Sequence, residues 1–448
     1  CINLKSVINK KLLYDLIWIV KISNWFCIYF PTFMCYFLKF IFRNILLTFA
    51  QYKNYKMQKV YILSALRTPM GSFGGALANF TATQLGSIAI KAAVDKSKID
   101  INHINEVYFG NVCQANVGQA PARQAALGAG ISIHVPCTTI NKVCASGMKS
   151  VMMASQAIML GQAEVMVAGG MESMSNIPYY LPKVRWGMKF GGGEVLDGLQ
   201  RDGLLDAYNH QAMGVCADAT AVKYGVTREE QDRFAIQSYT RASNATKEGR
   251  FANEIVAVEI PQKKGDALKM TEDEEYKNVM FDKIPSLRPA FTKDGTVTAA
   301  NASTINDGAA ALILAGENYV KAHGLSPLAE IVSFADAAHE PEWFTTAPTL
   351  AAPLALKRAG MNVADIDFYE VNEAFAVVTM AFNKALKISE DVVNVNGGAV
   401  ALGHPLGASG ARIITTLAHV LDQNNKECGL ATLCNGGGGA SAIIIKKV

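Results

Sequence analysis

Four short segments of the chain place a thiol, an imidazole or an amide among small residues. They are VCASG around Cys144, VNEAFA around Asn372, GGAVALGHPLGASG around His404 and CNGGGG around Cys434. A thiol can act as a nucleophile when an adjacent base activates it, and thiols and imidazoles exchange protons near neutral pH. These residue types therefore make the four segments candidates for nucleophilic and acid–base catalysis.

Cys144 precedes an apolar run, VMMASQAIML at residues 151–160, whose pattern suits a helix. Near a helix N-terminus the dipole and the free N–H groups favour an anion, and so a thiolate. A single cysteine at such a place is more often a small buried hydrophobic residue. The surrounding sequence must decide between these two interpretations.

The other three segments have ordinary alternatives of unequal strength. Asn372 could simply cap the helix that follows it. A turn at His404-Pro405 needs glycine and proline but does not need histidine, and the glycines beside Cys434 permit close backbone approach. No GxGxxG or GxxxxGK[ST] spacing occurs, and Ser409 lies in GASGA rather than GxSxG. Nucleotide-phosphate loops and hydrolase elbows are therefore disfavoured.

Composition narrows the class of protein. The chain has 448 residues, is 50% hydrophobic and carries a net charge of +4. This charge is too small to indicate a nucleic-acid partner. The nine cysteines form no CxxC pair and no cluster with zinc-ligand spacing, which favours free thiols in a reducing compartment and no zinc site. Two of those thiols are candidates for reactivity.

Residues 1–56 differ from the rest, with no glycine and one acidic residue, Asp15. Their longest uncharged stretch, residues 22–38, is marginal for a membrane span, and their single arginine is atypical of a mitochondrial presequence. Met57 begins a strand-like run. We expect 1–56 to be mistranslated upstream sequence or a wrong first exon, with an anchor or a targeting segment as the alternatives, and predict no membrane contact unless 1–56 is a true segment.

From residue 57 onward, strand-like and helix-like runs alternate, which indicates a layered α/β fold. The alternation is interrupted over 176–300, which holds prolines, a triple glycine and a charged helical stretch, and which we expect to be a binding or lid-like insert. The halves 57–175 and 301–448 have similar layouts and predict an internal duplication. The helix and strand runs expected in them are, in order, 59–65, 81–97, 106–112, 119–130, 163–170, 310–316, 328–337, 349–360, 365–386, 392–400, 409–423 and 429–448.

Six segments in order resemble the thiolase family, closest to its biosynthetic, acetoacetyl-CoA branch and to the potassium-activated mitochondrial type. They are INKVCASGMKS, MVAGGMESMSN, TAANASTINDGAA, VNEAFA, NGGAVALGHPLGASGARI and CNGGGGASA, and the likeness covers essentially all of 57–448. The resemblance implies a layered α/β/α/β/α fold of two duplicated halves around back-to-back sheets, with an inserted loop subdomain. It also implies a dimer or tetramer of identical chains.

The resemblance assigns a role to each candidate residue. Cys144 would carry the acetyl group as a thioester, His404 would take its proton, and Cys434 would be the second acid or base. His404 and a water held by Asn372 would stabilise the enolate of the acceptor. The backbone N–H groups of Cys144 and Gly436 would hold the tetrahedral intermediate.

The resemblance also implies coenzyme A as substrate and product, with no nicotinamide, flavin or zinc. Ser303 would contact the pantetheine arm, Lys283 would lie near the nucleotide end, and Met213 would line the acyl pocket. A potassium ion remains an open alternative to ordinary packing, with Tyr239 and four backbone positions, Ala299, Ala300, Ala302 and Val400, as its ligands. The chain departs from the family at 278–280, where Asn-Val-Met stands in place of Arg-Val-Asp.

The implied activity is acetyl-CoA C-acetyltransferase, which converts two acetyl-CoA reversibly into acetoacetyl-CoA and CoA. A 3-ketoacyl-CoA thiolase of broader chain length is the nearest alternative. A non-catalytic acyl-CoA or sterol-carrier module is an alternative from another class, and a carrier-protein-dependent condensing enzyme is disfavoured by Cys434. Family likeness predicts a mitochondrial protein, whereas a start at Met57 would predict a cytoplasmic one.

Overall fold

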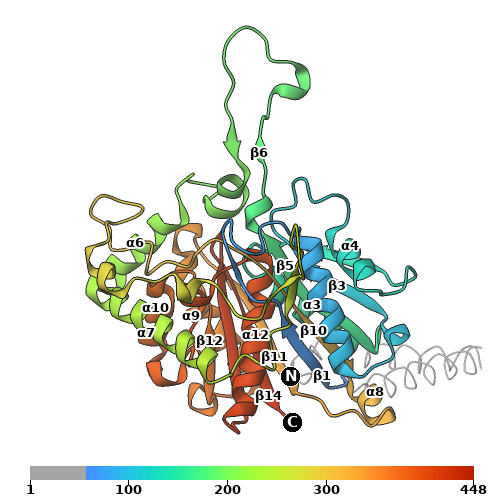
Figure 1. The fold of residues 1–448 in the computed structure, drawn as a ribbon. Coiled ribbons are helices and arrows are strands. Elements are labelled where there is room, and N and C mark those ends of the chain that lie inside the picture. Colours follow the sequence, from blue (N-terminus) through green and yellow to red (C-terminus); the bar gives the residue numbers. More distant parts are fainter. Residues whose placement is uncertain (1–56) are drawn as a thin grey trace, which may run out of the picture. The chain divides into compact units, whose positions relative to one another are not determined.

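The computed structural model describes residues 57–448. Its described strands form one ten-stranded sheet and two small hairpins, and helices cover both faces of the sheet (Figure 1). Within these residues no helix combines the length and the apolar character that a bilayer crossing requires. The expectations for residues 1–56 lie outside the described part of the chain.

The N-terminal half contributes the strand order β4-β3-β5-β10-β1, with β2 paired to β10. It includes β10, which lies in the 301–448 segment that the sequence pattern assigned to the second half. The strands β4, β3 and β5 run parallel, and β10 is antiparallel to both β5 and β1. These strands are β1 (Val60–Arg67), β2 (Gly71–Ser72), β3 (Glu106–Gly110), β4 (Cys137–Ile140), β5 (Val165–Ser173) and β10 (Asn306–Gly316).

The C-terminal half repeats this arrangement with one strand fewer, as β12-β13-β14-β11, in which one parallel pair is followed by two antiparallel pairs. The two halves join where β1 pairs with β11 through Val60, Tyr61 and Ile62. The strands are β11 (Ala329–Ala338), β12 (Phe368–Val371), β13 (Cys428–Asn435) and β14 (Gly439–Lys447). The duplication expected from the sequence pattern is therefore present in the topology.

Two helices lie between the two half-sheets. The helices α5 (Ser146–Met159) and α12 (Leu406–Gln423) contact strands of both halves, and α12 is buried along almost its whole length. The outer face of the N-terminal half carries α3 (Ala82–Ser97) and α4 (Pro121–Gly128), and that of the C-terminal half carries α9 (Pro348–Ala359) and α10 (Ala376–Leu386). Five layers result, as the resemblance implies (Figure 1).

One expected strand is absent. The run VVNVN was predicted to be a strand, but it forms a short 3-10 helix, Glu390–Val392, followed by a single bridge between Val393 and Tyr369. Asn394, at φ +49°, turns its side-chain amide onto Val371 and makes two hydrogen bonds of 2.8 Å with the backbone of β12. The side chain takes the place of a strand backbone there.

The insert at 176–300 holds the remaining elements. They are β6 (Tyr179–Tyr180), β7 (Leu196–Asp197), α6 (Met213–Tyr224), α7 (Arg228–Lys247), β8 (Val258–Ile260) and β9 (Leu268–Met270), with short helices between them; α8 (Glu317–Ala322) and α11 (Ala399–Leu402) belong to the halves. Residues 178–197, which we call the arm, project far from the body (Figure 1). The rest of the insert contributes residues to the cavity described next.

Candidate active site

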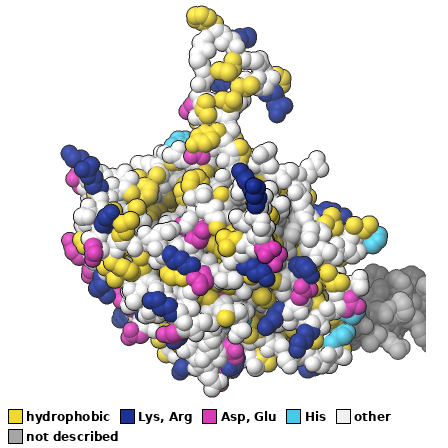
Figure 2. Space-filling view, in the orientation of Figure 1, with side chains coloured by type: hydrophobic (Ala, Val, Ile, Leu, Met, Phe, Trp, Pro, Cys, Tyr) yellow, Lys and Arg dark blue, Asp and Glu magenta, His cyan; other side chains and the backbone are white. Residues whose placement is uncertain are grey.

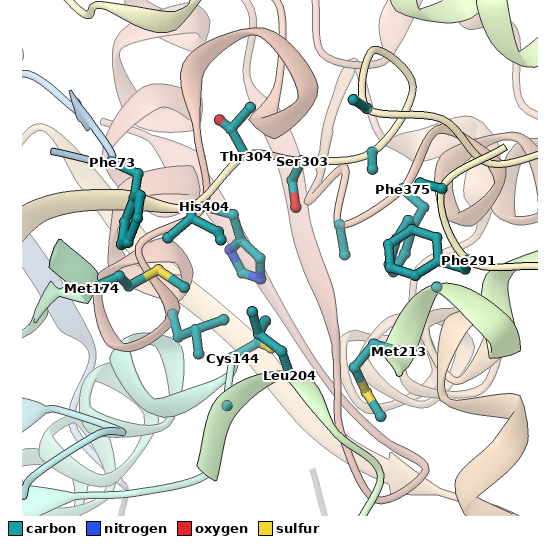
Figure 3. Close-up of a pocket in the computed structure, with 18 of the residues that line it drawn as sticks. Phe73, Cys144, Met174, Leu204, Met213, Phe291, Ser303, Thr304, Phe375 and His404 are labelled. Atoms are coloured by element: carbon teal, nitrogen blue, oxygen red, sulfur yellow. The ribbon is translucent and has the colours of Figure 1, made fainter. Parts of the chain in front are cut away.

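A cavity of about 520 Å³ opens where the two halves meet the insert. Cys144 and His404 both line it, and its walls are largely apolar (Figure 3). The insert supplies Met213 and Phe291, and the segment directly before β10 supplies Ser303. The cavity therefore combines a wide apolar passage with a small number of reactive groups, as small-molecule sites do.

Cys144 stands in a tight turn directly before α5. Val143 has a left-handed backbone, φ +47°, and the Ser146 hydroxyl bridges Lys142 N–H at 2.8 Å and Val143 C=O at 2.6 Å. This turn ends with Ala145 as the N-cap residue, which has no side-chain cap. The expected placement of Cys144 at a helix N-terminus is confirmed.

The expectation that this position favours a thiolate is wrong for the resting protein. Burial raises the pKa of Cys144 to about 11, although the backbone N–H groups of Gly436 and of Cys144 itself act in the opposite direction. Cys144 therefore rests as a thiol, and a base must remove its proton. The same two N–H groups point at the sulfur, where an acyl oxyanion would form.

His404 lies in the short segment between α11 and α12. Its backbone N–H donates to the buried Asn306 Oδ1 at 2.9 Å, and its Nδ1 lies 2.6 Å from the Ser409 hydroxyl. Ser409 is also 2.9 Å from the carbonyl of Pro405, so its hydroxyl can donate to that carbonyl and accept from Nδ1–H. The other ring nitrogen, Nε2, is buried and has no hydrogen-bond partner.

Burial, followed by the charge of Arg412, lowers the pKa of His404 to about 3. The ring is therefore neutral at physiological pH, and an Nε2 lone pair is available to take a proton. A neutral imidazole with one nitrogen held by a hydroxyl has the geometry of a general base. Such a base can remove the proton of the Cys144 thiol, which lines the same cavity.

Cys434 and Gly436 come from the end of β13 and the turn that follows. Cys434 is fully buried, and burial, with a further contribution from Cys144, raises its pKa well above the usual range. The charge of Cys144 acts on the Cys434 thiol, which itself does not line the cavity. Gly436 lines the cavity, and its N–H reaches the sulfur of Cys144.

Asn372 follows β12 directly and is fully buried. Its Nδ2 lies 3.5 Å from His404 Nδ1, and its Oδ1 has no hydrogen-bond partner. Its side chain makes no bond to the N-terminal N–H groups of α10, whose N-cap is Phe375. The alternative interpretation of Asn372 as a helix cap is therefore wrong, and an unpartnered amide oxygen beside His404 suits a bound water.

The structure separates the expected coenzyme-binding residues into two groups. Met213 and Ser303 line the cavity. Lys283 is exposed on a 3-10 helix, Phe281–Ser286, outside the cavity wall, and Tyr239 is buried against Phe281. The expected potassium ligands divide similarly, because Ala299 and Ala302 line the cavity whereas Tyr239 and Val400 share a buried cluster.

Three positioning residues were not found from the sequence. They are Ser409, whose sequence context bears only on a hydrolase nucleophile, and the buried residues Asn306 and Glu172. Glu172 accepts four hydrogen bonds, from Val112 N–H, Cys113 N–H, Gly407 N–H and the Asn111 side chain. The sequence does carry a signal for two of them: Glu172 is an acidic residue in an apolar strand, and Asn306 and Asp307 begin another apolar strand. Polar residues buried in a strand need hydrogen-bond partners.

Comparison with known proteins shows which protein family has this fold and these residues. Residues 60–318 match the family model "Thiolase, N-terminal domain", and residues 325–447 match "Thiolase, C-terminal domain". The chain is 55% identical over 391 residues to an acetyl-CoA acetyltransferase of Schizosaccharomyces pombe, covering 87% of this chain and 99% of that protein. It is also 55% identical over 393 residues to a mitochondrial acetyl-CoA acetyltransferase of Bos taurus, covering 88% of this chain and 92% of that one.

A cytosolic acetyl-CoA acetyltransferase of Gibberella zeae is 51% identical over 390 residues, with 87% of this chain and 98% of that protein covered. Among solved structures, the Acat5 thiolase from Ascaris suum in complex with coenzyme A superposes with a TM-score of 0.83 at 48% identity. The match covers 87% of this chain and all of that one.

Proposed function

The chain belongs to the thiolase family, and from this premise we propose that it is an acetyl-CoA C-acetyltransferase. It condenses two acetyl-CoA to acetoacetyl-CoA and CoA, reversibly, through an acetyl-cysteine intermediate. The observation that carries the proposal is the meeting of the Cys144 thiol with the unpartnered His404 Nε2 and the Gly436 N–H at the end of one cavity.

In the first half-reaction, His404 Nε2 takes the proton of Cys144, and the sulfur attacks the acetyl carbonyl. The negative oxygen of the tetrahedral intermediate lies on the N–H groups of Cys144 and Gly436. The C–S bond to coenzyme A then breaks, and CoA leaves with the proton held by His404. The enzyme retains the acetyl group as a thioester on Cys144.

In the second half-reaction, the Cys434 thiolate removes a proton from the methyl group of a second acetyl-CoA. The enolate oxygen is stabilised by His404 and by a water that Asn372 holds. The carbanion attacks the acetyl carbon on Cys144, and the C–S bond to Cys144 breaks. The Cys144 thiolate that leaves takes the proton that Cys434 accepted, which regenerates the Cys144 thiol and the Cys434 thiolate. The raised pKa of Cys434 makes it a strong base once it is deprotonated.

Replacing Cys144 by alanine tests the catalytic proposal. We expect acetoacetyl-CoA formation to fall by about 10³-fold or more, because the nucleophile is lost. Wild-type protein mixed with acetyl-CoA should gain the mass of one acetyl group on the peptide that contains Cys144. Unchanged turnover in Cys144→Ala would instead favour a non-catalytic acyl-CoA or sterol carrier.

Chain length separates this activity from that of a broader 3-ketoacyl-CoA thiolase. Thiolysis rates over a C4 to C16 series of 3-ketoacyl-CoA substrates should be greatest at C4. A maximum beyond C6 would contradict the acetoacetyl-CoA assignment.

For coenzyme A, we propose that the pantetheine arm passes Ser303 and Met213 along the cavity. The nucleotide end would then lie near Lys283, on the exposed 3-10 helix Phe281–Ser286, none of whose residues lines the cavity. The solved Ascaris suum thiolase holds coenzyme A, which supports this class of ligand.

We also propose a potassium site. The donors, the Tyr239 phenol and the backbone carbonyls of Ala299, Ala300, Ala302 and Val400, are the hard oxygens that such a cation prefers. Glu373 links their segments, because its carboxylate accepts from Ser238 Oγ at 2.7 Å and from Val400 N–H at 3.1 Å. Burial and the charges of Glu275 and Glu373 raise the pKa of Tyr239, so the phenol stays neutral. Equal activity in K⁺ and Na⁺ would contradict this site.

We propose that identical chains assemble into a dimer or tetramer. The edge of β4 has no paired strand among residues 57–448, and the arm exposes large apolar side chains (Figure 2).

We also propose a mitochondrial location, which is supported by the relatives named mitochondrial. Import of the full chain, compared with a chain that starts at Met57, into isolated mitochondria tests the location.

A further inference from the structure

One carboxylate of the C-terminal half, Asp336 on β11, receives two lysines from the N-terminal half. Lys142 Nζ binds one carboxylate oxygen, and Lys149 Nζ binds the other at 2.7 Å. Ser441 Oγ lies 2.6 Å from the first oxygen and 2.8 Å from Lys142 Nζ. We call Lys142, Lys149, Asp336 and Ser441 the inter-half cluster.

Residues of the inter-half cluster are close in sequence or strand register to both Cys144 and Cys434. On one side, Lys142 is two residues before Cys144 in the same tight turn, and Lys149 is on α5, which that turn begins. On the other side, Ser441 on β14 pairs in register with Leu433 on β13, the residue before Cys434. The four side chains thus connect the Cys144 turn to the strand that carries Cys434.

Stability alone is a weak explanation for the cluster. Its lysines and aspartate are 25–32% exposed, and partly exposed ion pairs contribute little to the free energy of folding. Its geometry is unusually specified, because three donors from two halves of the fold converge on one carboxylate. Hydrogen bonds from Lys142, Lys149 and Ser441 outweigh burial and lower the pKa of Asp336 to about 2, so the carboxylate is charged at neutral pH.

We propose that Asp336 is a positioning residue that fixes the distance between Cys144 and Cys434 by holding Lys142 and Lys149. The proposal rests on the proposed function. It concerns the second half-reaction, in which Cys434 takes the methyl proton and the resulting carbanion must reach the acetyl carbon on Cys144. The first half-reaction uses Cys144, His404 and the Gly436 N–H, and it does not require Cys434.

Asp336→Asn tests this directly, because it keeps the shape of the side chain and removes its charge. Two rates are measured: exchange of labelled CoA into acetyl-CoA, which reports the first half-reaction, and formation of acetoacetyl-CoA. We expect condensation to fall about 10- to 100-fold, since a misplacement of about 1 Å can cost about 100-fold. Exchange should fall by clearly less than condensation, because it needs the Gly436 N–H but not Cys434.

Two further variants make the result specific. Lys149→Met leaves the contact between Lys142 and Asp336 in place. It should therefore lower the rate of condensation more than the rate of exchange, but by a smaller factor than Asp336→Asn does. It replaces Asp336→Asn as the test if that variant does not fold. Asp367→Asn is the matched control. Asp367 accepts hydrogen bonds from the backbone N–H groups of Glu427 and Cys428 and forms an ion pair with Lys426. None of these three partners lines the cavity. The control variant should leave both rates unchanged.

A parallel fall of exchange and condensation in Asp336→Asn would overturn the positioning role, and so would wild-type condensation. A wild-type protein that shows no exchange at all would instead overturn the proposed function. The two failures are therefore distinguishable in one set of assays.

Discussion

At the scale of single residues, the reactivity of Cys144 follows from the balance between burial and its two N–H donors. With a pKa of about 11, the thiolate fraction should rise about tenfold for each pH unit between pH 7 and 10. Alkylation of Cys144 by iodoacetamide, followed by mass spectrometry, should increase over this whole range. Levelling near pH 8 would show that the N–H groups outweigh burial.

Ser409 should matter to catalysis because it holds His404 Nδ1 and so fixes the orientation of Nε2. We expect Ser409→Ala to lower kcat by about 10- to 100-fold with little change in thermal stability. Ser155→Ala is the matched control, because Ser155 is also a buried helical serine that bonds a carbonyl four residues earlier, Val151, outside the cavity. Equal effects of the two substitutions on kcat would contradict the role of Ser409.

The sequence predicted the reactive groups more completely than the groups that hold them. A thiol or histidine beside glycines is visible in one segment, so Cys144, His404 and Cys434 were found. The partners of His404 were not found, because Asn306 lies 98 positions away and Ser409 resembles an ordinary helical serine. The sign of the Cys144 pKa shift was also missed, since burial depends on the whole fold.

At the scale of elements, glycines let α5, α12 and two strands approach closely around the site. A Cβ on Gly170 would lie 1.9 Å from the carbonyl oxygen of Gly407, which is backbone and cannot move aside. We expect Gly170→Ala to lower the free energy of unfolding by about 1–3 kcal/mol or more. Urea denaturation measures it, and Gly192→Ala, where no atom lies within 4 Å, should change stability by less.

Sequence periodicity predicted most elements, because buried strands and amphipathic helices leave a regular pattern. It failed at 392–396, where Asn394 replaces strand pairing with side-chain hydrogen bonds to Val371. An apolar alternation cannot reveal that a side chain will supply the hydrogen bonds of a backbone. The Asn394 side chain forms the hydrogen bonds at the edge of β12 that a neighbouring strand would otherwise form.

At the scale of the whole molecule, the arm is the feature that a single chain does not explain. Trp186 is 84% exposed, and Phe190 is also fully exposed; Tyr179, Leu181, Val184, Met188 and Val195 are exposed beside them (Figure 2). Such a concentration of apolar side chains marks an interaction surface, and aromatic residues are typical of interface centres. We propose a second copy of the chain as the occupant, because closed symmetry favours contacts between identical chains.

Removing the arm should therefore reduce the assembly. Because Tyr179 and Tyr180 pair with Asp197 and Leu196, an Asn-Gly turn can replace residues 181–195 and close a two-residue hairpin. We expect the shortened chain to form a smaller assembly by light scattering, with condensation activity per chain retained, because no residue of 181–195 lines the cavity. Val222→Ser, at a single exposed apolar residue, should leave the assembly size unchanged. If the shortened chain kept the full mass while losing sedimentation with lipid vesicles, the arm would be a membrane contact rather than a contact between copies.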